Sequence, residues 1–272
     1  MEYKFSLKGG SLSSTDVVDH HGKLLVRKTI SITNEREFGF YRWYGQYKKT
    51  MEMSKHFPEI IPIPDNFQVN DSTYSYTIPY YNNFINGYEY LRNPSADVEK
   101  FADQLFKILS NFRSRPRVIP GEWLKLYWNE EVALRLDFAF DNFEDIFEGN
   151  KLKIDGHPIV VPTKKYLWDC FNESLPKNIN LINTHGNLTL ENILYNPNNN
   201  KIMFIDLYEE NYFDIAVNDI SQLQQSCKYF YEERNNGVYE EFDLDINCSF
   251  SKPKKLNKFN EMLEQFIKKN IP

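Results

Sequence analysis

The chain has 272 residues, a length that suits one large domain or two modest lobes. Apolar residues make up 41% of it and charged residues 26%, so a folded core is expected and general disorder is excluded. The 32 basic and 38 acidic side chains give a net charge of −6, which argues against a general nucleic-acid binder because such proteins need a basic face. A small anionic ligand held by a local cluster is compatible with this charge.

Three scattered cysteines are too few for a disulfide framework or a zinc site, so a reducing compartment is expected. The start of the chain has no apolar run behind basic residues, and no stretch approaches the roughly 18 apolar residues of a membrane span. The sequence therefore predicts a cytoplasmic protein without a secretory signal or a membrane-spanning helix.

The first ninety residues predict short strands joined by turns. Residues 4–12 are strand-like, and residues 16–19 and 23–30 predict a hairpin closed at His20-His21-Gly22. Residues 67–69 and 74–79 predict a second pair of strands. Between the two pairs, Asn34 is placed to cap a helix, with acidic residues in its first turn, and three prolines from position 58 onward end it.

After Pro94 the pattern becomes helical. Helices are predicted over residues 97–112, 123–147, 166–174, 214–233 and 254–270. A strand-like patch, residues 180–206, interrupts them and contains an Asn-rich turn. The economical interpretation is a β-rich amino-terminal lobe, residues 1–85, and a larger, mainly helical lobe, residues 86–272.

Three polar residues of this strand-like patch are suited to metal chemistry. Asn187 lies in a predicted loop, Asn192 at the exit of that loop, and Asp206 directly after the apolar run Met203-Phe204-Ile205. A hairpin closed by the Asn-rich turn would bring Asn192 and Asp206 together. Amide and carboxylate oxygens of this kind suit Mg²⁺, which also takes phosphate oxygens and water.

The run Thr184-His185-Gly186-Asn187 with its continuation to Tyr195 resembles the Brenner-type motif of aminoglycoside phosphotransferases, choline kinases and related small-molecule kinases. His185 matches the histidine of that motif, Asn192 its metal-binding asparagine and Asp206 its metal-binding aspartate. The run that begins at Asp219 is similar to the helix start that follows in the family, although Asp219 most simply caps a helix. Members connected with bacterial surface-polysaccharide or capsule biosynthesis are the most similar.

The resemblance implies an α+β, two-lobed protein-kinase-like fold that binds ATP or GTP with Mg²⁺. It implies transfer of the γ-phosphate to a small-molecule hydroxyl acceptor, such as a sugar or an amino alcohol. His185 would support the metal-binding Asp206 through hydrogen bonds. A protein kinase is disfavoured because the loop lacks an Arg-Asp pair and no activation segment is recognisable.

One departure concerns catalysis. The catalytic aspartate of the family falls on Asn187, and an amide can orient a substrate hydroxyl but cannot accept its proton. Three explanations stay open: a substitution that silences an enzyme, a natural pseudokinase that binds nucleotide or acts as a scaffold, and an enzyme whose base lies elsewhere.

The resemblance also implies a phosphate-binding lysine held by a helical glutamate. Lys28 in the predicted strand 23–30 is the candidate, on the same strand face as Val26, which would cover the nucleotide base. Glu37 is the expected partner and Glu35 the next choice.

Two further nucleotide contacts follow from the same resemblance. Gly9, Gly10 and Ser11 would form a phosphate-covering loop whose N–H groups bind anions. Ile78 and Tyr80 fit the hinge between the lobes, whose backbone would bind the edge of the adenine.

Overall fold

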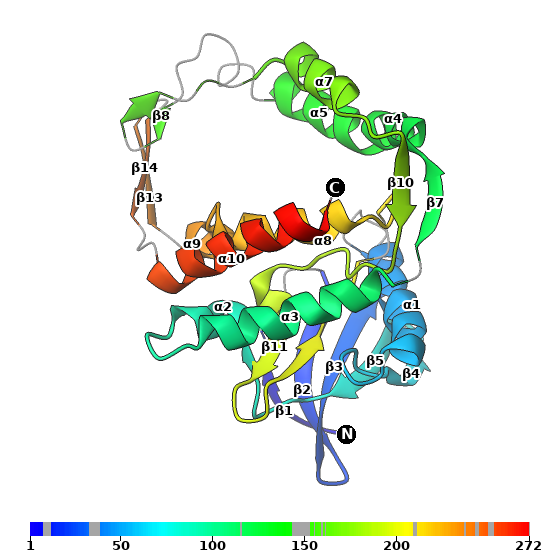
Figure 1. The fold of residues 1–272 in the computed structure, drawn as a ribbon. Coiled ribbons are helices and arrows are strands. Elements are labelled where there is room, and N and C mark those ends of the chain that lie inside the picture. The colour runs from blue at the N-terminus through cyan, green and yellow to red at the C-terminus, as the bar shows by residue number, and fades with distance from the viewer. Residues whose placement is uncertain are drawn as a thin grey trace. The chain divides into compact units, whose positions relative to one another are not determined.

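The computed structural model describes all residues except 8–11, 33–38, 115, 143–152, 155, 159, 161, 209–210, 237, 243–244, 250–252 and 272. The chain forms two compact units. The first unit comprises Met1–Ile108, His185–Asn211 and Asn218–Leu223, and the second comprises Leu109–Thr184, Tyr212–Val217 and Gln224–Pro272. An antiparallel sheet fills the amino-terminal region and helices dominate the carboxyl-terminal part, so the predicted α+β class is confirmed (Figure 1). The lobe boundary after residue 85 stays a prediction.

The first unit begins with a five-stranded antiparallel sheet of order β1-β2-β3-β5-β4. Its strands are β1 (Glu2–Ser6), β2 (Ser14–His20), β3 (Lys23–Ser31), β4 (Asp65–Val69) and β5 (Thr73–Pro79). The predicted β2–β3 hairpin is confirmed. Its two turn residues, His21 and Gly22, have φ angles of 55° and 79°, as a two-residue turn that matches the strand twist requires.

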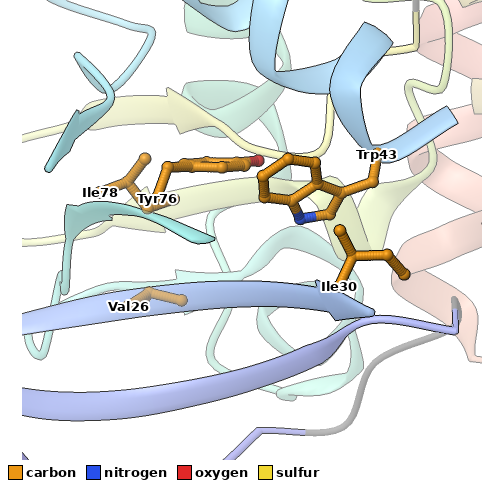
Figure 2. Packing of buried hydrophobic residues seen from close by; sticks show 5 residues of the cluster. All are labelled: Val26, Ile30, Trp43, Tyr76 and Ile78. Carbon is orange, nitrogen blue, oxygen red and sulfur yellow. The ribbon is translucent and has the colours of Figure 1, made fainter. Parts of the chain in front are cut away.

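Burial alternates along β3, as a strand with one covered face requires. Val26, Lys28 and Ile30 are the buried residues of this strand. Helix α1 (Phe40–His56) packs on this face and places Trp43 next to Ile30 and Tyr76, as Figure 2 shows. The Trp43 and Tyr76 ring centroids lie 5.1 Å apart. Burying such side chains supplies about 1.5–3 kcal/mol each, so this cluster holds α1 on the sheet.

Helix α1 begins later than the sequence pattern indicated. Its first residue is Phe40 and Gly39 occupies the N-cap, whereas the predicted capping region around Asn34 lies outside the described residues. The helix ends at His56, two residues before Pro58, as predicted.

A second, smaller sheet completes the first unit. It has the order β12-β11-β6. Its strands are β6 (Ile85–Asn86), β11 (Ile193–Asn196) and β12 (Lys201–Phe204). Helix α2 (Gly87–Arg92) follows β6, and helix α3 (Val98–Phe112) buries its predicted apolar stripe. The Tyr195 ring of β11 lies 5.2 Å from Phe101 of α3 and 4.7 Å from Tyr90 of α2, so an aromatic core supports the β11–β12 hairpin.

The second unit is mainly helical. The middle of helix α8 (Ala216–Cys227) belongs to the first unit and its two ends to the second. The other helices of the second unit are η1 (Gly121–Trp123), α4 (Leu124–Tyr127), the π-helical η2 (Trp128–Ala133), α5 (Leu134–Asn142), α7 (Lys164–Glu173), α9 (Tyr231–Asn236) and α10 (Lys254–Asn270). The bounds of α10 coincide with the predicted ones. None of the helices in the described part of the chain is long and apolar enough to cross a membrane.

The second unit also contains two small sheets. Strands β7 (Arg117–Pro120) and β10 (Asn178–Leu181) pair antiparallel. Strands β8 (Lys153–Ile154), β9 (His157–Pro158), β13 (Val238–Phe242) and β14 (Asp245–Ser249) form a four-stranded sheet. The β13–β14 hairpin has no counterpart among the elements that the sequence pattern predicted.

Candidate active site

The loop that begins at His185 is bound by a buried carboxylate. Asp219 is only 3% exposed, and its two oxygens accept the backbone N–H groups of His185 and Gly186 at 2.9 and 2.7 Å. The interpretation of Asp219 as a helix cap is wrong, because Ile215 is the N-cap of α8 and Asp219 lies inside the helix. Charge-assisted bonds of this kind are stronger than neutral ones, so Asp219 fixes the entry of the loop.

His185 connects this loop to the strand end that carries Asp206. Its imidazole is fully buried, Nδ1 accepts the Asn187 N–H at 3.2 Å, and Nε2 lies 2.8 Å from the Ile205 carbonyl oxygen. Because Nδ1 accepts, the proton lies on Nε2, which donates. Burial, and to a lesser extent the positive charge of Lys49, lower the pKa of His185 to about 3. The ring is therefore neutral and acts as a hydrogen-bonding spacer.

Glycine is the residue type that fits position 186. Its φ angle is 84°, in the left-handed region, and an added Cβ would lie 2.5 Å from both the Tyr208 carbonyl oxygen and Asn211 Nδ2. The loop and the segment after Asp206 are thus packed backbone to backbone. The Tyr208 N–H donates to the His185 carbonyl at 2.9 Å, which joins the two segments directly.

Asn187 and Asn192 are linked across the loop. The Asn187 carbonyl accepts from Asn192 Nδ2 at 2.8 Å and from the Thr189 N–H at 3.0 Å. This bond uses the amino group of the Asn192 amide and leaves its oxygen for another partner. The Asn192 carbonyl also accepts the Ile205 N–H at 3.1 Å, one residue before Asp206. The β11–β12 hairpin therefore brings Asn192 and the Asp206 position to the same open end, as its register of Ile193 with Phe204 requires.

Lys28 reaches the same place from the other sheet. Its Nζ donates to Asp206 Oδ1, an ion pair between residues 178 positions apart. Asp206 has a φ angle of 60°, and a non-glycine residue held in this region is a feature that clusters at functional sites. Burial lowers the pKa of Lys28 to about 8. The structure thus joins the predicted phosphate-binding lysine to the predicted metal-binding carboxylate.

Other predicted nucleotide contacts lie outside the described residues. These are the loop residues Gly9, Gly10 and Ser11 and the proposed lysine partners Glu35 and Glu37. Their roles stay predictions.

The predicted hinge residues Ile78 and Tyr80 take part in strand pairing, and their role as nucleotide contacts stays a prediction. The Tyr80 N–H donates to the Leu24 carbonyl at 3.1 Å, so it is occupied by strand pairing. In an antiparallel ladder every second residue bonds to the same neighbour, so the backbone of Ile78 also faces β3.

The Asn192 amide oxygen and the Asp206 carboxylate are donors of the kind that Mg²⁺ takes in proteins. Among the described residues there is no group of three or more His, Cys, Asp or Glu side chains placed to hold a metal. Mg²⁺ requires fewer protein ligands than that, because phosphates and water complete its shell. The ammonium of Lys28 against Asp206 shows that this carboxylate accepts a cation here.

No family model matches the chain, and no curated protein matches its sequence significantly. Among solved structures, the chain is similar to a protein from Haemophilus somnus 129PT described as a candidate fructosamine-3-kinase. The identity is 9%, the match covers 96% of this chain and 90% of that chain, and the TM-score is 0.47. It is also similar to a glucosamine kinase, with 10% identity, coverage of 98% and 80%, and a TM-score of 0.45. Similarities at this level of identity and TM-score do not indicate the function of this chain.

Proposed function

We propose that this protein is a magnesium- and ATP-dependent phosphotransferase that acts on the hydroxyl group of a small molecule. The observation that supports this proposal is the convergence of Lys28 from β3, the His185 loop and Asp206 at the end of β12. These residues come from three separate stretches of the chain, and the ion pair and hydrogen bonds that join them lie within one compact unit. The motif resemblance allows ATP or GTP as the nucleotide, and ATP is the one used in the test.

In this proposal Lys28 binds the nucleotide phosphates, and the ammonium leaves Asp206 when they enter. The Asn192 oxygen and the Asp206 carboxylate would hold Mg²⁺, which would neutralise charge on the phosphates. Phosphoryl transfer depends mainly on positioning and electrostatics, so few protein groups are needed. The loop hydrogen bonds of His185 and Asp219 supply that positioning through the backbone.

Asn187 would contact the acceptor hydroxyl. Its backbone is fixed by bonds to the His185 imidazole and to the Asn192 amide, so its side chain starts from a defined position. The amide can orient a hydroxyl without accepting its proton. The acceptor is proposed to be a sugar or an amino alcohol, and a connection with surface-polysaccharide biosynthesis rests on the motif resemblance alone. A cytoplasmic location likewise rests on the sequence.

The experiment compares the wild-type protein with Asn187→Asp in an ATP-consumption assay with Mg²⁺ and a panel of sugars and amino alcohols. A restored base is expected to raise turnover by about a hundredfold or more. Asn70→Asp, which adds a carboxylate at an exposed turn, is the matched control and is expected to change nothing. Calorimetric titration of the wild-type protein with Mg²⁺ and a non-hydrolysable ATP analogue tests binding separately.

The amide at Asn187 specifically favours one alternative, a pseudokinase that binds nucleotide without transferring phosphate. Nucleotide binding with no turnover in either protein would support this alternative. Equal turnover of both proteins would indicate a base elsewhere in the chain. Absence of nucleotide binding would refute both functions.

A further inference from the structure

Helix α1 contributes two cations to the segment that follows Asp206. Lys49 is 8% exposed, and its Nζ donates to the Tyr208 carbonyl at 2.7 Å. The Arg42 guanidinium lies over the Tyr208 ring, 5.1 Å from its centroid. The two cations are seven residues apart, which is two helical turns, so they project from the same face of α1.

These contacts complete the fixation of Asp206. On its amino-terminal side the His185 imidazole binds the Ile205 carbonyl. On its carboxyl-terminal side both backbone polar groups of Tyr208 are bound, the N–H by the His185 carbonyl and the carbonyl by Lys49. Asp206 lies between these contacts with its left-handed φ angle of 60°. A strained residue keeps such a conformation only when its neighbours are held.

Lys49 also lies close to the His185–Gly186 loop. A Cβ built at Gly186 would be 3.3 Å from Lys49 Nζ, and the positive charge of Lys49 contributes to the low pKa of His185. An acidic side chain in place of Lys49 would repel the Tyr208 carbonyl oxygen.

We infer that Lys49 is a positioning residue that sets the metal-binding Asp206 by holding Tyr208 against the His185 loop. The metal part of this inference rests on the proposed function, whereas the holding of Tyr208 does not. Helix α1 is thereby connected to the site, because its Lys49 ammonium binds the backbone carbonyl of Tyr208, two residues after Asp206. Displacement of α1 would release Tyr208 and loosen Asp206.

The test uses Lys49→Met, which removes the ammonium, and Lys49→Arg, which keeps a cationic donor. Lys48→Met is the matched control, because Lys48 is the exposed neighbour on the same helix and its Nζ lies over the Tyr44 ring. The first measurement is hydrogen exchange of the peptide that contains Tyr208, without ligand. The second is the affinity for an ATP analogue with and without Mg²⁺.

In Lys49→Met, exchange at Tyr208 is expected to be about tenfold faster, since its local hydrogen bonds open more easily. The gain in nucleotide affinity on adding Mg²⁺ is expected to fall about tenfold, with metal-free affinity within about twofold of the wild-type value. Lys49→Arg should restore part of both effects, and Lys48→Met should show neither.

Unchanged exchange at Tyr208 in Lys49→Met would overturn the inference. So would an equal rise of exchange in β3 peptides together with a general loss of thermal stability, because Lys49 would then be merely structural. If the wild-type protein binds no Mg²⁺-nucleotide but Lys49→Met still speeds exchange at Tyr208 alone, the holding of Tyr208 is supported and the proposed function fails.

Discussion

Gly186→Ala tests the close packing between the His185 loop and the segment after Asp206. The added Cβ would lie 2.5 Å from the Tyr208 carbonyl oxygen, which belongs to the backbone and cannot rotate away. Gly22→Ala is the matched control, since Gly22 has a similar φ angle of 79° and nothing within 4 Å of an added Cβ. The pair therefore separates the cost of the left-handed conformation from the cost of the contact.

The left-handed conformation costs each variant roughly 1–2 kcal/mol. Gly186→Ala adds overpacking of about 1–3 kcal/mol, and moving Tyr208 weakens its bond to the His185 carbonyl, worth about 1 kcal/mol. The excess over Gly22→Ala is thus about 2–4 kcal/mol. At about 2–4 °C per kcal/mol for a chain of this size, the excess loss in Tm is on the order of 4–16 °C.

The assay is thermal unfolding followed by circular dichroism, with urea unfolding as a second measure of the free energy. Calorimetry with a Mg²⁺-nucleotide analogue then reports whether the site is disturbed, and Gly186→Ala is expected to bind more weakly than Gly22→Ala. Equal losses of Tm in the two variants would refute the backbone packing between Gly186 and Tyr208.

Asp219→Asn is expected to destabilise the protein by about 1–3 kcal/mol, because one of the two oxygens that accept the His185 and Gly186 N–H groups becomes a donor. Thermal unfolding beside Asp103→Asn, an exposed acid of α3, checks this, and equal Tm values would contradict it. For Lys28, with its pKa lowered to about 8, metal-free nucleotide affinity should be full below that pH and fall above it, as calorimetry across the range measures. Stability should change in the opposite direction. Between about pH 8 and pH 10.5, the ordinary pKa of lysine, the unfolded chain binds more protons than the folded chain, so the free energy of unfolding rises with pH. The variant Lys28→Arg should show neither the fall in affinity nor the rise in stability.

Local elements were predictable because their causes are local. The apolar spacing of α10 and of α3 and the turn residues His21 and Gly22 are all present in short windows of sequence. The hairpin that unites Asn192 with Asp206 was predictable for the same reason, since an Asn-rich turn lies between two apolar runs. The start of α1 was misplaced because the Asn34 capping pattern is local, whereas the helix begins at Phe40, which packs against the buried cluster on the sheet.

Partners across the chain were not predictable from such windows. Asp219 was expected to cap a helix, and its role depends on backbone groups more than thirty residues earlier. Sequence also does not reveal which residues of β5 pair with β3, so the choice of Ile78 and Tyr80 as hinge contacts rested on the family resemblance. A sequence signal for Lys49 did exist, because it lies four residues before the apolar Met53 and helical spacing places both on one face of α1.

The His185 loop is held by its main chain, and this bears on how Asn187→Asp should behave. The bonds that place Asn187 come from its backbone N–H and carbonyl, to the His185 imidazole and the Asn192 amide. Exchanging its side-chain amide for a carboxylate of the same shape alters none of these bonds. The variant should therefore keep the wild-type Tm within about 1 °C, because substitutions away from buried contacts change stability little. A change in turnover would then report the chemistry of the new carboxylate, and a large loss of Tm would show that the Asn187 side chain supports the loop.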